Sequence, residues 1–258
     1  MCLPLAFVVL TMAGLGAWRW LILLSVPAVV AALILSQSRN AWLGLGVGGV
    51  AWVVLGRQRW VMVVILLGAA VLFGVAWLLD VGQIQGRIAA TANPLAEGRI
   101  GIWLAAWEMF KDAPLLGQGP HVFGELYVDY LGRAALPDGY VAELGYMPWA
   151  HCIYLELLCE RGVLGFGAFG LMLAAMGRRL LAARRRATTM TTHSYAVGLT
   201  ASLLVFMAMG VLDLTFLKDW VTLVFWMLAA LAATAPQAVT ASERRASGNP
   251  PARARRQA

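Results

Sequence analysis

A short polar stretch between long apolar runs carries the residues best suited to chemistry. It reads Tyr146-Met-Pro-Trp-Ala-His151-Cys-Ile-Tyr-Leu-Glu156. A histidine titrates near neutral pH and can take a proton from an attacking hydroxyl. Ionisable groups at the mouth of a membrane span are costly to keep, so they indicate a functional site. His151 is therefore the candidate catalytic residue, and Glu156 is a candidate supporting carboxylate.

Two arginines suit the same chemistry. Arg39 lies in Ser36-Gln-Ser-Arg39-Asn-Ala-Trp42 between two apolar runs, and Arg99 lies in the polar middle of the chain. Arginine makes planar, permanently charged contacts with phosphate oxygens. Two arginines and a histidine near headgroup depth suit a lipid-linked phosphate or pyrophosphate, whose departure needs charge stabilisation. The alternative, that Arg39 and Arg99 only extend to lipid headgroups, stays open.

The composition places these residues in a membrane protein. The chain has 258 residues, of which 61% are hydrophobic and only 13% charged, whereas about a quarter of a soluble domain is charged. The net charge of +7 is concentrated in 178–186 and 244–256, which indicates membrane topology rather than nucleic-acid binding. Three cysteines give neither an even disulfide framework nor paired metal-ligand spacing. We expect no metal and no cofactor.

Seven apolar runs approach or exceed the length needed to cross a hydrocarbon core of about 30 Å. We therefore predict an all-α integral membrane protein with about seven transmembrane helices. Its expected parts are four spans in 1–79, a polar loop over 80–150, three spans in 151–235 and a disordered basic tail over 236–258. The runs cover roughly residues 3–17, 20–36, 41–56, 60–79, 152–176, 195–216 and 219–234.

The arginines of the short loops predict the orientation of the spans. Alternating spans put Arg57, Arg59, the 178–186 cluster and the basic tail on one side, which the excess of positive charge identifies as the cytoplasm. The loop 80–150 then lies on the outer face, together with the 36–42 junction and the 215–220 turn.

The outer loop contains a predicted interfacial helix. Arg99, Trp103 and Trp107 recur at four-residue spacing, and Asp112-Ala-Pro114 ends the pattern. Tryptophans at headgroup depth are typical of such a helix, so Trp103 is a candidate supporting residue. The following Leu115-Leu-Gly-Gln-Gly-Pro120 predicts a turn. It is too short for a phosphate-binding loop and lacks a following Lys-Ser/Thr.

An acidic residue, Asp213, falls near the outer end of the sixth apolar run. A carboxylate inside a membrane needs a partner. Arg39, Arg99 or Lys218 could be that partner, or Asp213 could orient His151. We expect a supporting role rather than direct chemistry.

Three stretches resemble the C-terminal half of the bacterial O-antigen ligase / O-antigen polymerase family, in order and spacing, over roughly residues 20–230. The family usually has Asn after the histidine, where this chain has Cys152, and usually has more spans upstream, so we expect a fragment or a mis-assigned start. The stretches are Ser38-Arg39-Asn-Ala-Trp-Leu-Gly44; Gly98-Arg99-Ile-Gly-Ile-Trp103 with Asp112-Ala-Pro-Leu-Leu-Gly-Gln-Gly-Pro120 and Phe123; and His151-Cys-Ile-Tyr-Leu-Glu156 with Glu160-Arg-Gly-Val-Leu-Gly165.

The resemblance implies a metal-independent glycosyltransferase on the periplasmic face of the bacterial inner membrane. Members transfer a glycan from undecaprenyl pyrophosphate to lipid A-core, to another glycan repeat or to a protein hydroxyl. By that analogy Arg39 and Arg99 bind the pyrophosphate, His151 activates the acceptor hydroxyl, and Asp213 matches an acid near the penultimate span. We favour ligation to lipid A-core. A transporter of lipid-linked anions, which would carry ionisable groups near mid-bilayer, and an inactive truncated membrane subunit stay open.

Overall fold

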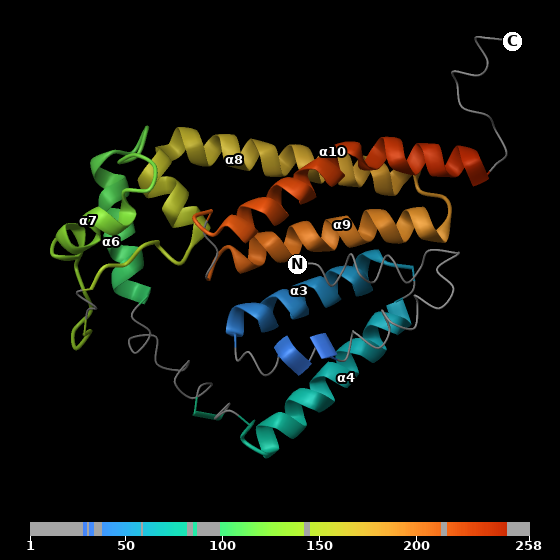
Figure 1. The fold of residues 1–258 in the computed structure, drawn as a ribbon, viewed down its shortest axis with the longest axis horizontal. Helices are drawn as coiled ribbons and strands as arrows, with labels where there is room; N and C mark the ends of the chain where they lie inside the picture. The colour runs from blue at the N-terminus through green and yellow to red at the C-terminus, as the bar shows by residue number, and fades with distance from the viewer. Residues whose placement is uncertain are drawn as a thin grey trace, which may run out of the picture. The chain divides into compact units, whose positions relative to one another are not determined.

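The computed structural model is helical throughout its described elements (Figure 1). It describes residues 28–29, 31–33, 38–57, 59–81, 85–86, 99–141, 145–212 and 216–246, and none of these residues is in a strand. The labelled helices are α3 (Arg39–Leu55), α4 (Arg59–Leu78), α6 (Arg99–Asp112), α7 (Phe123–Leu131), α8 (Ile153–Arg186), α9 (Met190–Met209) and α10 (Asp219–Ala246).

Among the described residues, three helices, α8, α9 and α10, are long and apolar enough to cross a membrane. Shorter apolar helices cover Asn40–Leu55 and Met62–Leu78, where two spans were predicted at 41–56 and 60–79. The chain is thus an all-α membrane protein. The predicted runs 3–17 and 20–36 lie mostly outside the described residues, so the number of seven spans stays a prediction.

The chain divides into two compact units. Unit 1 comprises Met1–Phe73, Leu173–Met207 and Val224–Ala258, and unit 2 comprises Gly74–Met172 and Ala208–Leu223. The helix α8 contributes its first part to unit 2 and its last part to unit 1. All predicted site residues except Arg39 belong to unit 2.

Unit 1 is built on aromatic and aliphatic packing between apolar helices. Trp52 of α3 is fully buried in a cluster with Met62 of α4 and Val197 of α9. Figure 1 shows α9 and α10 running side by side, and the rings of Phe206 and Phe225 meet there with centroids 4.9 Å apart. Such aromatic pairs add to the free energy of simple burial.

The basic segments of unit 1 meet at one end of it. Arg57 Nη1 donates to the Thr188 carbonyl at 3.1 Å, and Arg184 Nη2 donates to the Leu55 carbonyl at 3.4 Å. Glu243 accepts from the amides of Thr188 and Thr189 at 2.8 and 2.9 Å. The turns α3–α4 and α8–α9 and the end of α10 therefore gather together, in agreement with the predicted common side. Which compartment they face stays a prediction.

The tail differs from the prediction. We expected disorder from Pro236, whereas α10 continues through Pro236 to Ala246. Proline removes one hydrogen bond from a helix and strains it, but Ala235 and Val239 on either side are buried, and Glu243 is held by the start of α9. Tertiary packing outweighs the proline over this stretch. Residues 247–258 lie outside the described part.

Unit 2 has its own core, made where α6 and α7 cross the start of α8. The helix α6 covers Arg99–Asp112, where the interfacial helix was predicted, and it ends at the predicted stop. Its position on a membrane stays a prediction. Trp103 packs partly buried against the core and Trp107 is exposed. The buried residues are Ile102, Ala105, Ala106, Met109, Phe123, Tyr127, Tyr130, Leu131, Ala150 and Cys159.

Candidate active site

The helix that follows His151 is broken one third of the way along. Gly162 has φ 61° and ψ −168°, which divides α8 into parts 153–161 and 163–186. In a continuous helix Val163 N would donate to Cys159 O, and Leu164 N would donate to Glu160 O. At the break these groups need other partners, because a buried backbone amide or carbonyl without one is costly.

The turn after α6 supplies those partners. Gln118 N and Gly119 N donate to Cys159 O and Glu160 O at 2.8 and 3.0 Å. In return Val163 N and Leu164 N donate to Pro114 O and Leu115 O at 2.8 and 3.3 Å. The segment 114–119, which we call the inserted turn, thus replaces the backbone hydrogen bonds that α8 lacks at the break. The sequence predicted a turn here but not its partner.

Two glycines permit this close approach. A Cβ on Gly117 would lie 2.2 Å from the Glu160 carbonyl carbon, and a Cβ on Gly162 would lie 2.3 Å from Leu115 O. Both glycines also have positive φ, of 74° and 61°, which other residues adopt at a cost. These glycines belong to two of the stretches that carry the family resemblance. In the structure they let the backbone of the inserted turn approach the backbone of α8 closely.

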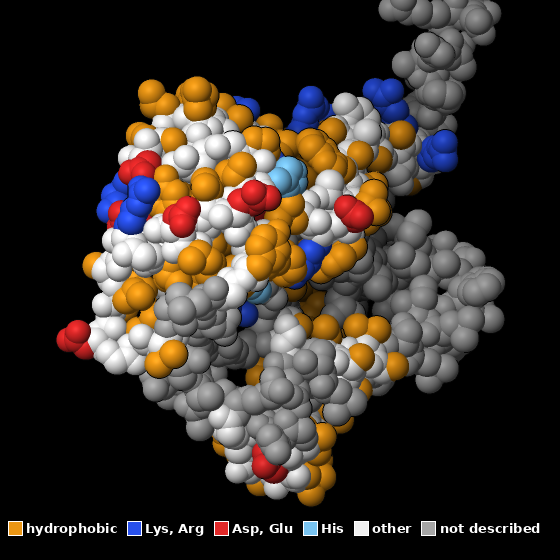
Figure 2. Space-filling view, turned by 60° about the vertical axis from the view of Figure 1, so that its left-hand side comes forward, with side chains coloured by type: hydrophobic (Ala, Val, Ile, Leu, Met, Phe, Trp, Pro, Cys, Tyr) orange, Lys and Arg blue, Asp and Glu red, His pale blue; other side chains and the backbone are white. Residues whose placement is uncertain are grey.

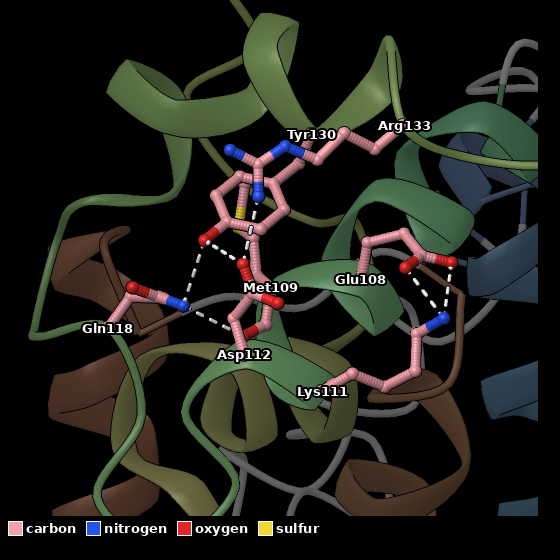
Figure 3. A network of polar contacts seen from close by, with 7 residues as sticks. All are labelled: Glu108, Met109, Lys111, Asp112, Gln118, Tyr130 and Arg133. Carbon is pink, nitrogen blue, oxygen red and sulfur yellow. Dashed lines mark hydrogen bonds and ion pairs between the residues drawn. The ribbon is translucent and has the colours of Figure 1, made fainter.

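A side-chain network holds the inserted turn to α6 and α7 (Figure 3). Gln118 Nε2 donates to Met109 O at 2.9 Å and to the Tyr130 hydroxyl at 3.1 Å. The Tyr130 hydroxyl donates to Asp112 Oδ2 at 2.9 Å. Burial, with help from the Asp112 carboxylate, raises the pKa of the Tyr130 phenol, so the hydroxyl keeps its proton and remains a donor. Arg133 donates to the same Asp112 oxygen and lies over the Tyr130 ring.

The carboxylate of Glu160 links the broken helix to α7. It is buried, and its Oε1 accepts from Phe123 N at 3.4 Å. Phe123 begins α7, whose preceding residue Val122 makes no side-chain capping bond. An acceptor with negative charge stabilises the start of a helix. Glu160 of the broken helix thus caps the start of α7.

His151 occupies a backbone position that few side chains take. Its φ is 50°, in the left-handed region, where histidine is tolerated better than branched or bulky residues. Ala150 and Cys152 on either side are buried, whereas His151 is only partly so. Ile153 N donates to Gly210 O at 2.9 Å, which fixes the start of α8. This backbone presents His151 while its neighbours pack inward, and strained residues of this kind occur often at functional sites.

An aromatic ring and a lysine accompany His151. The ring centroids of Trp149 and His151 are 5.6 Å apart, and Lys218 Nζ lies 4.7 Å from the Trp149 ring centroid. That distance is within the range of a cation–π interaction. Lys218 comes from the α9–α10 connection, so two distant segments bring a cation and a histidine to the same indole. Nothing in the local pattern singles out Trp149 beyond its place two residues before His151.

The other predicted site residues do not all lie near His151 in the described part of the chain. Arg99 is half-buried at the start of α6, and Trp103 one turn later packs against the core that contains Ala150. Glu156 is buried in the first part of α8. Arg39 begins α3 in unit 1, and its side chain lies outside the described part. Asp213 also lies outside it. The helix α9 ends at Met209, seven residues short of the predicted run, because the chain turns at Gly210.

Histidine reaches the surface among hydrophobic and acidic side chains on the face shown in Figure 2. His121, in the loop between α6 and α7, is exposed and also has positive φ, of 63°. Among the described residues no group of three or more His, Cys, Asp and Glu side chains could hold a metal ion. The described part of unit 2 brings His151, Trp149 and Lys218 together, and Arg99 begins α6 in the same unit.

Comparison with known proteins gives the chain a family. No curated protein matches it. The family described as O-Antigen ligase matches residues 20–170, which include α3, α6, the inserted turn, His151 and the break at Gly162. This match extends over more than half of the chain and confirms the resemblance seen in its motifs, and the family indicates transfer of glycans. The chain belongs to the O-antigen ligase family.

Proposed function

We propose that this chain transfers an oligosaccharide or polysaccharide from undecaprenyl pyrophosphate to a hydroxyl acceptor, lipid A-core in the first instance, on the periplasmic face of the inner membrane. The observation that carries the proposal is the geometry of His151. It stands in the left-handed region between two buried residues at the start of α8. Family membership supplies the reaction class, and His151 supplies a group able to accept a proton.

In the proposed reaction the acceptor hydroxyl attacks the anomeric carbon of the donor glycan. The new bond joins the acceptor oxygen to that carbon, and the bond from the carbon to the pyrophosphate oxygen breaks. The leaving polyprenyl pyrophosphate keeps the electron pair, and His151 takes the hydroxyl proton. Direct displacement inverts the anomeric configuration. A metal is not needed if fixed cations stabilise the leaving group.

The cations proposed for that task are Arg39 and Arg99. The packing of α6 supports Arg99, because its helix shares one hydrophobic core with the residue before His151. For Arg39 the support is its motif at the start of α3. Lys218 joins them as a third candidate, since it reaches the ring next to His151. Trp103, Glu156 and Asp213 are proposed to support these groups rather than to react.

The test is lipopolysaccharide banding on gels in a host that lacks its own ligase. His151→Asn is the sharpest variant, because asparagine also tolerates the left-handed region but is not a base. We expect long-chain lipopolysaccharide with the original chain and its loss with His151→Asn at equal membrane level. His121→Asn is the matched control, since His121 is exposed, has a similar φ and carries no proposed role.

The products separate the remaining possibilities. Normal banding with His151→Asn would contradict the role of His151. If the original chain instead lengthens polyprenyl-linked glycans, the acceptor is another repeat and the chain is a polymerase. Glycan attached to protein would identify a protein hydroxyl as the acceptor. Arg99→Lys should weaken donor binding in each case, because lysine cannot contact phosphate oxygens in a bidentate way.

A further inference from the structure

The break in α8 lies at the edge of its apolar part. From Gly162 to Gly177 the helix carries no ionisable side chain, whereas Glu156, Glu160 and Arg161 precede the break. Apolar side chains in this part are widely exposed, among them Leu164 at 61% and Leu171 at 74%. Since α8 is long and apolar enough to cross a membrane, these side chains mark its lipid-facing surface.

The inserted turn continues that surface. Its leucines, Leu115 and Leu116, are 66% and 73% exposed. Leu115 is tied to the lipid-facing part of α8 by the hydrogen bond from Leu164 N to its carbonyl. Exposed leucines of the turn therefore adjoin exposed Val163 and Leu164 of the helix. Contiguous exposed apolar patches mark interaction sites.

Several backbone groups of the turn also have protein partners, which irregular backbone in a bilayer needs. Non-helical backbone is tolerated at membrane depth only where protein satisfies its polar groups. Gln118 N and Gly119 N bond to α8, Gly117 N bonds to Ala113 O, Pro114 has no amide hydrogen, and the carbonyls of Pro114 and Leu115 accept from α8. Residues 113–120 contain no ionisable side chain.

We propose that the inserted turn is a membrane-embedded element whose leucines contact the acyl chains of the lipid bilayer. We assign lipid rather than a protein partner to these leucines, because they continue the exposed apolar surface of α8, a helix able to span the membrane. The loop between α4 and α8 would then touch the membrane at its middle, and not only through α6. This proposal concerns the lipid contact of unit 2 and is independent of the glycan transfer proposed above.

The contact can be measured with a photoreactive side chain in the full-length chain in native membranes. A benzophenone amino acid placed at Leu116 should give adducts with radiolabelled phospholipid on irradiation. Leu171, exposed on α8, serves as the lipid-facing reference, and Asp129, exposed on α7, serves as the reference outside the patch. We expect the yield at Leu116 to equal that at Leu171 within a factor of about two and to exceed that at Asp129 severalfold.

A second measurement uses spin labels in liposomes of phosphatidylethanolamine and phosphatidylglycerol. Single cysteines replace Leu116, Leu171 or Asp129 in a background carrying Cys2→Ser, Cys152→Ala and Cys159→Ala. A label at Leu116 should collide more with oxygen, which concentrates in lipid, than with a water-soluble nickel chelate. Chelate accessibility like that at Asp129 would overturn the proposal. So would adducts at Leu116 with a protein instead of lipid, which would identify a protein interface.

Discussion

The two ends of α8 are held in opposite ways. Near its start, in unit 2, backbone meets backbone, and Gly117 and Gly162 allow the contact because they have no side chain. After its end, in unit 1, side chains make the contacts, chiefly that of Glu243. Glu243 accepts from the amides of Thr188 and Thr189 and from the hydroxyls of Thr188 and Thr192. One connection depends on the absence of side chains, and the other depends on their presence.

This difference determines how each connection should respond to substitution. A backbone contact admitted by glycine has no space for an added atom, so even a methyl group must move the turn or the helix. A carboxylate that caps a helix start in a partly exposed place can be replaced in part by water.

The largest effect is expected at Gly162. Gly162→Ala forces a Cβ to within 2.3 Å of Leu115 O at a positive φ, and strain and overpacking together should cost about 3 kcal/mol or more of stability. Gly117→Ala should do the same. Thermal challenge followed by size-exclusion chromatography in detergent measures the folded fraction.

The matched control for that experiment is Gly167→Ala on the same helix. A Cβ there meets nothing within 4 Å, and alanine favours a helix over glycine by roughly 0.5–1 kcal/mol. We therefore expect equal or higher stability. If Gly162→Ala is as stable as the original chain, the inserted turn does not hold α8 in the way described.

A smaller loss is expected in the network around the inserted turn. Gln118→Ala removes the bonds to Met109 O and the Tyr130 hydroxyl, and Tyr130→Phe removes the donor to Asp112. Each change should cost about 1–2 kcal/mol. Because the groups share one network, the double variant should lose less than the sum of the two. Strict additivity in a double-mutant cycle would contradict the network.

The segment 99–120 was the part best predicted from sequence, for physical reasons. Helical spacing and the Asp112-Ala-Pro114 stop defined α6 at its true end, and the glycines after it defined a turn. The break at Gly162 was not predicted, because an apolar run with one glycine also fits an unbroken helix. Only the partner segment, distant in sequence, gives Gly162 its conformation.

The site was predicted by residue type and not by geometry. His151 was found because an ionisable group beside apolar runs is unusual. Its left-handed backbone and its neighbours Trp149 and Lys218 depend on the α9–α10 connection, which no local pattern reveals. In unit 1, Pro236 suggested an end to the helix, and the carboxylate of Glu243 that opposes this could not be recognised without its distant partners.

A moderate effect is expected at Glu243. Glu243→Ala removes the acceptor for the start of α9 and should cost about 1 kcal/mol, as loss of a helix cap does. Glu243→Gln keeps one oxygen and should recover part of that loss. The same thermal assay measures both, with Ser242→Ala, an exposed neighbour, as control. Equal loss in Glu243→Gln and Glu243→Ala would mean that charge alone, and not hydrogen bonding, holds the connection.

The smallest effect is expected at Arg133, on the exposed edge of the same network as Tyr130. Its ion pair with Asp112 joins side chains that are 59% and 51% exposed, and such pairs contribute about 0.2–1 kcal/mol, less at high salt. Arg133→Met should therefore change thermal stability little, and the small change should shrink as salt rises. Asp112→Asn should cost more, because the Tyr130 hydroxyl loses a charged acceptor. Suppose instead that Arg133→Met lowers thermal stability as much as Asp112→Asn does at every salt concentration. The Arg133 side chain would then be essential for holding the inserted turn on α8. Glycine-dependent backbone contacts would not be the main contacts that hold unit 2 together.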